Sequence, residues 1–215
     1  MRNQRARPII GILILVFATC AVPDAWAGAP TDQLRSGIDQ VFKILRDPEM
    51  AGDKKAVQRR AAILAAATSI FDFGEMAKRS LGQHWTARTP VERTQFVALF
   101  TDLIQQSYIN KVDQHGDSKT IFKGETVEGD LAAVRTLIPL SDGKEMPLEY
   151  RMHNTDARWQ VYDLSIDGIS LVSNYRAQFN KIIRIDSYET LVTKLKSHQT
   201  EFSAPAASPS TKAAR

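Results

Sequence analysis

The side chains that could support catalysis are few and scattered along this sequence. Ser165, His153 and Asp163 are the three residue types of a hydrolytic triad, in which a histidine activates a serine and a carboxylate orients the histidine. The Gly-x-Ser-x-Gly turn that exposes such a serine in α/β-hydrolases is absent. The sequence therefore argues against hydrolysis, and we expect that the protein is not an enzyme.

Metal and cofactor chemistry is also poorly supported. The four histidines, His84, His115, His153 and His198, have neither i, i+4 partners nor an adjacent carboxylate motif of the kind that binds zinc. No glycine-rich loop is present that could hold a phosphate group. We therefore expect no bound metal and no cofactor.

The first 27 residues have the composition of a secretory signal peptide. Three arginines precede an apolar run from Ile9 to Ala18, and Ala25-Trp26-Ala27 is a small-x-small cleavage pattern. The run is too short for a spanning helix, which needs about 20 apolar residues. We expect cleavage before Gly28, which removes the only cysteine, Cys20, and with it any disulfide framework or thiolate site.

The charge of the remaining chain is small. Removing residues 1–27 takes away three arginines and one aspartate, so the formal net charge falls from +4 to +2. So weak a basic excess predicts neither nucleic-acid binding nor strong adhesion to membranes.

The first half of the remaining chain has the apolar periodicity of helices. A helix is expected from about Thr31 and ends at Pro48, and a second one follows from about Asp53. The second helix should pack through a narrow face of mostly small residues: Val57, Ala61, Leu64, Ala65 and Thr68. Asp72 and Glu75 are spaced to cap a short helix that leaves at Gly82.

The strongest helix-start pattern is Thr89-Pro90-Val91-Glu92, which combines a capping threonine, a proline in the first turn and a glutamate able to reach back. A broad apolar stripe follows over about three turns: Phe96, Leu99, Phe100, Leu103, Ile104, Ser107 and Tyr108.

After Asp117 the apolar period changes from helical to alternating, which predicts strands. Four are expected, at Thr120–Glu128, Leu131–Leu140, Met146–His153 and Trp159–Ile166, with a polar loop from Asn154 to Arg158. Asp167-Gly168 should form a tight turn, followed by a short extended piece and a helix that opens near Ser173 or Asn174.

Two amphipathic helices should complete a single domain spanning residues 28–202. Residues 203–215 lack large apolar side chains and are expected to be a disordered tail. Short connections between the strands imply antiparallel pairing. The fold class is therefore α+β: a twisted antiparallel sheet of four or more strands packed on one face against several N-terminal and C-terminal helices. Sequence periodicity leaves open whether this arrangement has a solid core or an apolar cavity.

Three stretches resemble a known family. They are Phe71–Gly82, Thr101–Tyr108 and Trp159–Arg176, and they occur in the order and approximate spacing of the MlaC-like proteins, the periplasmic phospholipid-binding components of Mla-type ABC transport systems. The resemblance covers roughly Leu34 to Leu195. It implies a periplasmic location and a hydrophobic cavity between sheet and helices that takes the acyl chains of a lipid. It also implies two partners: the substrate-binding subunit of an inner-membrane ABC transporter and an outer-membrane lipoprotein complex.

The apolar faces of the matching elements are the candidate lining of that cavity. We expect the lipid to contact the following residues: Phe73, Met76, Phe96, Phe100, Leu103, Ile104, Tyr108, Ile138, Met146, Leu148, Tyr150, Met152, Tyr162, Leu164, Ile166, Ile169, Leu171, Val172 and Phe179.

Several alternatives remain open. Some relatives are associated with hopanoid synthesis, so the ligand could be a polycyclic lipid, and a non-transport scaffold with a solid core is a further hypothesis. Arg135 and Asp163 lie on otherwise apolar strands. They could form a buried ion pair with each other, or contact a lipid head group or glycerol ester.

Overall fold

The computed structural model describes residues 29–114, 119–140, 142–156, 158–197 and 202. Its α-helices are α1 (Ala29–Leu45), α2 (Ala56–Ile70), α3 (Phe73–Leu81), α4 (Pro90–Gln114), α5 (Leu171–Ile185) and α6 (Tyr188–Lys196). Its strands are β1 (Ile121–Glu128), β2 (Leu131–Pro139), β3 (Glu145–Thr155), β4 (Arg158–Ile166) and β5 (Ile169–Ser170). The expected α+β class is confirmed, because helices precede and follow one run of strands.

The five strands form one open antiparallel sheet in the order β1-β2-β3-β4-β5. The alternation expected for β3 is confirmed, since Tyr150 and Met152 are buried while Arg151 between them is exposed. The turn expected at Asp167-Gly168 is also confirmed: both residues have positive φ, 51° and 79°. A two-residue turn of this kind matches the twist of the strands it joins, here β4 and the short β5.

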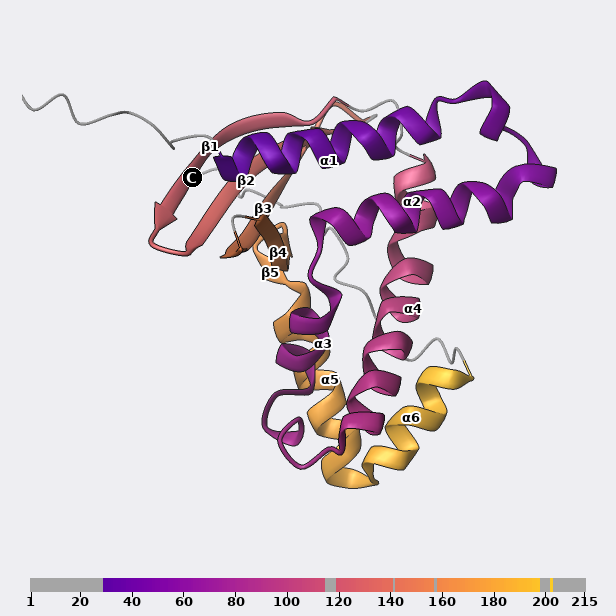
Figure 1. Cartoon of the computed structure of the whole chain (residues 1–215), viewed down its shortest axis with the longest axis vertical. Helices are drawn as coiled ribbons and strands as arrows, with labels where there is room; N and C mark the ends of the chain where they lie inside the picture. Colours follow the sequence, from indigo (N-terminus) through magenta and orange to yellow (C-terminus); the bar gives the residue numbers. More distant parts are fainter. Residues whose placement is uncertain (1–28, 115–118, 141, 157, 198–201, 203–215) are drawn as a thin grey trace, which may run out of the picture.

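The helices divide between two regions of the molecule. Figure 1 shows α1 and α2 as a hairpin lying across one face of the sheet and extending beyond it, while α3, α4, α5 and α6 run away from the sheet as a bundle. The chain connects the two regions at Phe71, which bridges to Val161 at the edge of β4, and at Ser170, where β5 leads directly into α5.

Each region has its own hydrophobic cluster of buried residues. We call them the bundle core and the sheet core. The bundle core comprises Met76, Ala77, Leu81, Phe96, Phe100, Ile104, Ile166, Leu171, Val172, Tyr175, Phe179, Tyr188, Leu191, Val192, Leu195 and Phe202. The sheet core comprises Leu34, Ile70, Ala132, Val134, Tyr150, Met152, Trp159 and Val161.

The starts of α3 and α4 are fixed by side-chain caps. Thr89 and Glu92 form the expected reciprocal box: the Thr89 amide donates to Glu92 Oε2 at 2.7 Å, and the Glu92 amide donates to Thr89 Oγ1 at 3.3 Å. Asp72 accepts a hydrogen bond from the Glu75 amide at 2.8 Å and caps the start of α3. The chain leaves that helix at Gly82, which has a positive φ of 57°. These local predictions are confirmed because a cap involves residues only three positions apart.

The prediction of which face of α2 is buried is wrong. Val57 is 81% exposed, and Ala61, Ala65 and Thr68 are exposed as well. The helix instead buries Ile63, Ala66 and Ile70. Alanines occur on every side of this helix, so its periodicity does not define a face, and packing of Ile70 against Gly37 of α1 decides the orientation.

Two boundaries also differ from expectation. The loop between β3 and β4 is shorter than predicted, since β3 runs to Thr155 and β4 begins at Arg158. Helix α5 begins at Leu171, two residues before the expected start, because Ser170 Oγ accepts from the Ser173 amide and the Asp163 carboxylate accepts from the Val172 amide. Asp163 lies nine residues before Val172, outside the three- or four-residue spacing of a capping pattern, so such a pattern does not reveal this contact.

The predicted signal peptide (1–27) and the predicted disordered tail (203–215) lie outside the described residues and remain predictions. Among the described helices, none combines the length and the apolar character needed to cross a bilayer.

Candidate functional site

Ten of the nineteen candidate lining residues are buried and belong to the two cores. Tyr150 and Met152 lie in the sheet core, and the other eight lie in the bundle core. Those eight are Met76, Phe96, Phe100, Ile104, Ile166, Leu171, Val172 and Phe179. Their neighbours are other protein side chains, so in this structure they stabilise the fold.

Seven other candidates are only half-buried although they are large and apolar. We call them the apolar band: Phe73, Leu103, Tyr108, Ile138, Met146, Leu148 and Leu164. All but Ile138 pack against the bundle core, and Leu148 and Leu164 also pack against the sheet core. Ile138 joins them through the strand register, as the partner of Met146.

The strand register places the sheet members of the band on one face. Leu148 pairs with Ile166, and its neighbour on that face, Tyr150, pairs with Leu164. Leu103 and Tyr108 come from α4, which belongs to the bundle. The band therefore lies where the two cores meet, and each of its side chains has apolar surface that the protein does not fully cover.

Tyr162 and Ile169 do not join this band. The pairing of β3 with β4 shifts between Arg151 and Met152, which leaves Tyr162 without a strand partner. The Tyr162 ring instead contacts the edge of His153, with ring centroids 5.7 Å apart, and lies 4.2 Å from the Arg79 guanidinium carbon. Ile169 is 43% exposed in the turn after β4. A single-residue bulge is not visible in an alternating sequence pattern.

Phe71 was missing from the candidate lining residues although it packs against both cores. Its place in the Phe71–Gly82 motif could have indicated this, but it precedes the helix cap and has no periodic neighbour. Leu99, part of the predicted stripe of α4, is likewise half-buried against the bundle core.

Tyrosine hydroxyls lie close to the band at two points. Burial raises the pKa of Tyr150 to about 12, and the neighbouring Thr136 hydroxyl opposes that rise only in part. Burial also raises the pKa of Tyr108 and Tyr175, whose hydroxyls are neighbours between α4 and α5. All three phenols therefore stay protonated at neutral pH and can donate hydrogen bonds within an apolar environment.

The ion pair suggested between Asp163 and Arg135 does not form. Arg135 is exposed and donates to Thr126 Oγ1 at 3.3 Å. Asp163 is 4% exposed and accepts from Ser170 Oγ at 2.7 Å and from the Val172 amide at 3.1 Å, with Arg151 Nη1 3.6 Å away. The carboxylate is fully used in fixing the start of α5, because a buried charge must be paired.

The possible triad is not assembled either. His153 pairs in register with Gln160, which lies five residues before Ser165 on β4. The side chains of His153 and Ser165 are therefore roughly 15 Å apart along the strand. His153 Nε2 lies 3.1 Å from Asp72 Oδ2, and the Asp163 carboxylate accepts the two hydrogen bonds described above.

The other histidines do not gather at one place in the described residues. His84 contacts Asn180 Oδ1 at 3.0 Å, while His115 and His198 lie outside the described residues. Within the described part of the chain, no group of three potential metal ligands is found.

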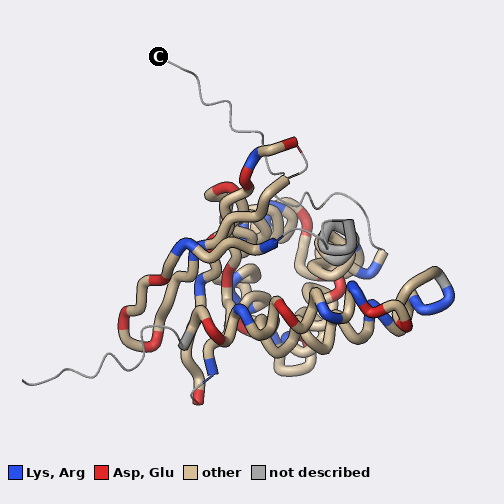
Figure 2. Tube along the Cα trace, turned by 90° about the horizontal axis from the view of Figure 1, so that it is seen from above, with Lys and Arg blue, Asp and Glu red and all other residues tan. Residues whose placement is uncertain are grey.

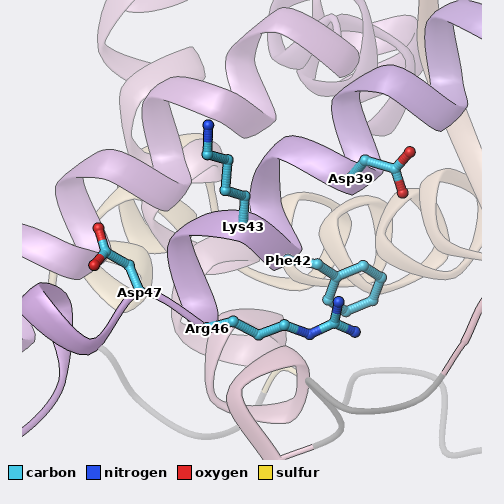
Figure 3. Close-up of a pocket in the computed structure, with 5 residues that line it drawn as sticks. All are labelled: Asp39, Phe42, Lys43, Arg46 and Asp47. Atoms are coloured by element: carbon cyan, nitrogen blue, oxygen red, sulfur yellow. The ribbon is translucent and has the colours of Figure 1, made fainter.

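A concavity of about 630 Å³ is present at the C-terminal end of α1, away from the band. Its lining is mainly charged: Asp39, Phe42, Lys43, Arg46 and Asp47 (Figure 3). Figure 3 shows Arg46 extending beside the Phe42 ring, and the guanidinium carbon lies 5.5 Å from the ring centroid. This site does not have the apolar lining expected for acyl chains.

Comparison with models of protein families identifies the family to which the chain belongs. A family model described as MlaC protein matches residues 35–197, which is most of the chain and includes the band and both cores except Leu34 and Phe202. The chain belongs to the MlaC family. The resemblance noted from the three sequence stretches is thereby confirmed.

Two similar proteins illustrate how far the similarity extends. The intermembrane phospholipid transport system binding protein MlaC of Haemophilus influenzae is 26% identical over 121 residues, which cover 54% of this chain and 56% of that protein. A phospholipid-binding protein from Ralstonia solanacearum, solved in complex with a phospholipid, superimposes with a TM-score of 0.69. It is 23% identical, and the match covers 80% of this chain and 96% of that one. The second match shows that the open-sheet fold is shared.

Proposed function

We propose that this protein binds a glycerophospholipid by its acyl chains and carries it between membranes of the cell envelope. The observation that carries the proposal is membership of the MlaC family over residues 35–197. Two relatives support it: one is named as an intermembrane phospholipid transport binding protein, and one was solved with a phospholipid bound. The apolar band offers surface for such a ligand, and the proposed role is transport without chemical change.

The apolar band is the proposed contact surface for the acyl chains. Its side chains are apolar but incompletely covered, so burying them under a hydrocarbon chain is favourable by about 25 cal/mol per Å². The bundle core and the sheet core behind the band are packed already, so chains would enter between them. The fully buried candidate residues would then support the site without all touching the ligand.

The energetic need for such a carrier is large. Two acyl chains of ~16 carbons would cost on the order of 25 kcal/mol to pass bare through water, at about 0.8 kcal/mol per CH₂. A carrier that binds through the chains discriminates weakly between head groups. The tyrosine hydroxyls beside the band could contact ester oxygens, but selection should rest mainly on chain length and shape.

The proposed route follows from the expected signal peptide and from the partners implied by the family. The protein would be exported to the periplasm. There it would exchange lipid with the substrate-binding subunit of an inner-membrane ABC transporter and with an outer-membrane lipoprotein complex. Such a carrier follows whichever gradient its energised partner sets, so either direction of net transport is compatible with the same binding site.

The first test is direct identification of the ligand. The protein is purified from cells that export it, extracted with organic solvent and analysed by mass spectrometry. We expect about one glycerophospholipid per protein with mixed head groups. Hopanoid as the main extracted lipid would replace the phospholipid proposal, and lipid-free protein from a membrane-rich lysate would support a scaffold instead.

A pair of variants on α4 tests the position of the site. Leu103→Asp puts a carboxylate into the band, where contact with an acyl chain would require desolvating the charge. Ala98→Asp places the same group on an exposed position of the same helix. We expect extracted lipid to fall several-fold in the first variant only, with both proteins folded by circular dichroism. A folded Leu103→Asp protein with full lipid content would refute the placement.

A further inference from the structure

The free end of the α1–α2 hairpin projects beyond the sheet (Figure 1). Figure 1 shows it extending past the sheet on the side opposite the β1–β2 turn, with neither strands nor bundle helices alongside its outer end. We call residues 43–60 the hairpin tip. They comprise the last residues of α1, the two short 3₁₀ turns Pro48–Met50 and Asp53–Lys55, and the beginning of α2.

The hairpin tip also carries an excess of basic residues. Its six cationic residues are Lys43, Arg46, Lys54, Lys55, Arg59 and Arg60, against the acidic residues Asp47, Glu49 and Asp53. The resulting net charge of +3 exceeds the +2 of residues 28–215 as a whole. Figure 2 shows the Lys and Arg positions gathered along the outer part of the hairpin. A low net charge for the chain therefore conceals a strongly asymmetric distribution.

The β1–β2 turn, on the other side of the sheet, carries acidic residues. The β1–β2 turn is flanked by Glu128 and Asp130, both exposed. The basic hairpin tip and this acidic turn thus lie on the two sides of the sheet. A negatively charged surface would attract the first and repel the second, and so would orient the whole protein.

Several cations of the tip are available for such a contact. Lys43, Lys54 and Arg60 are exposed, and among the described residues no ion pair is found for any of them. Val57 stands among them with 81% of its surface exposed. Exposed basic side chains next to an exposed aliphatic one suit the boundary between lipid head groups and acyl chains.

We propose that the hairpin tip docks on the surface of a bilayer that contains anionic lipid. Each Lys or Arg near such a surface contributes to adhesion, and the projecting shape lets the tip reach a flat surface before the bundle or sheet can collide with it. Val57 would enter the head-group layer. The contact is reversible, because a few exposed cations give salt-sensitive binding.

This docking is separate from the proposed binding of a carried lipid. The hairpin tip shares no residue with the apolar band, so a protein emptied of its lipid should still dock, and a protein that no longer docks should still hold lipid. The two proposals can therefore fail independently.

The test compares two triple variants by sedimentation with vesicles. One set of vesicles contains phosphatidylcholine alone, and the other contains equal parts of phosphatidylcholine and phosphatidylglycerol. The tip variant is Lys43→Gln, Lys54→Gln and Arg60→Gln. Its control, Lys181→Gln, Arg184→Gln and Lys196→Gln, removes the same charge from exposed positions of α5 and α6.

We expect the wild-type protein to sediment with the anionic vesicles at low salt and to be released as salt is raised. The affinity of the tip variant for anionic vesicles should fall at least about tenfold. The control variant should bind about as well as wild type. Equal losses in both variants would mean that overall charge governs adhesion, and absence of wild-type binding at low salt would point to an acidic protein as the occupant; either result overturns the proposal. Lipid extracted from the tip variant should be unchanged.

Discussion

The bundle core and the apolar band are both built from large apolar side chains, yet they differ in how completely those side chains are enclosed. In the bundle core, Phe96, Phe100, Tyr175 and Phe179 are fully buried and contact one another edge-on or stacked, with centroids 5.7–6.3 Å apart. The band, one helical turn away along α4, keeps Leu103 half-buried. The core is held by aromatic geometry, whereas the band has surface to offer a ligand.

The largest effect should distinguish these two regions directly. Phe100→Ala removes a ring from an enclosed aromatic cluster and should lower the free energy of unfolding by about 3–5 kcal/mol. Leu103→Ala on the same helix should cost only about 1–2 kcal/mol in lipid-free protein, because the leucine is already partly exposed. Urea unfolding of both variants measures the difference. Equal losses would show that the band is part of the solid core.

The second prediction concerns the junction where the sheet leads into the bundle. Asp163→Ala removes the acceptor of the Val172 amide and of Ser170 Oγ, and should cost about 2–3 kcal/mol because these donors are left unpaired near buried surface. Arg151→Ala should cost less than about 1 kcal/mol, since the arginine side chain is 46% exposed. Thermal unfolding of the two variants provides the comparison, and a larger loss for Arg151→Ala would contradict the assignment of Asp163 as a helix cap.

The third prediction addresses the sheet side of the molecule. A Cβ at Gly37 of α1 would overlap the Ile70 side chain of α2. Gly37→Ala should therefore separate the two helices and destabilise the protein by about 1–2 kcal/mol, despite the higher helix propensity of alanine. Gly74→Ala, where the nearest atom is an Asp72 carboxylate oxygen at 3.3 Å, is the control for a glycine within a helix. A Gly37→Ala protein as stable as wild type would mean that the hairpin adapts easily.

The smallest effect concerns the start of α4 in the bundle. Thr89→Ala should cost about 1 kcal/mol through loss of the cap. Hydrogen bonds from the Thr89 backbone amide, and secondly from its hydroxyl, hold the pKa of Glu92 below its usual 4.5. A lowered pKa in the folded state means that this stabilisation is present above pH 4.5 and is lost as the pH falls through the lowered value.

The difference in melting temperature between wild type and Glu92→Gln tests the direction in which this stabilisation changes with pH. It should be constant at neutral pH and should shrink in acid as Glu92 becomes protonated in the wild type. A gap that widened in acid would show that the carboxylate destabilises the helix start.

The sequence by itself determined the elements whose causes are local. The Thr89–Glu92 box, the Asp72 cap, the Asp167-Gly168 turn and the alternation of β3 all depend on residues within a few positions of one another. The family resemblance came from motifs of the same local kind, and with them the α+β class. Periodicity and capping preferences carry this information because they act along a single helix or strand.

Only the tertiary structure decided properties that depend on what lies opposite. Packing against Gly37 chose the buried face of α2, and a single-residue bulge turned Tyr162 towards Arg79 and His153. Asp163 found its partners in Ser170, Val172 and Arg151, not in Arg135. The degree of burial that separates the band from the cores is likewise a property of two surfaces meeting. A sequence pattern describes one of those surfaces at a time, so it identifies apolar residues without showing which of them remain free for a ligand.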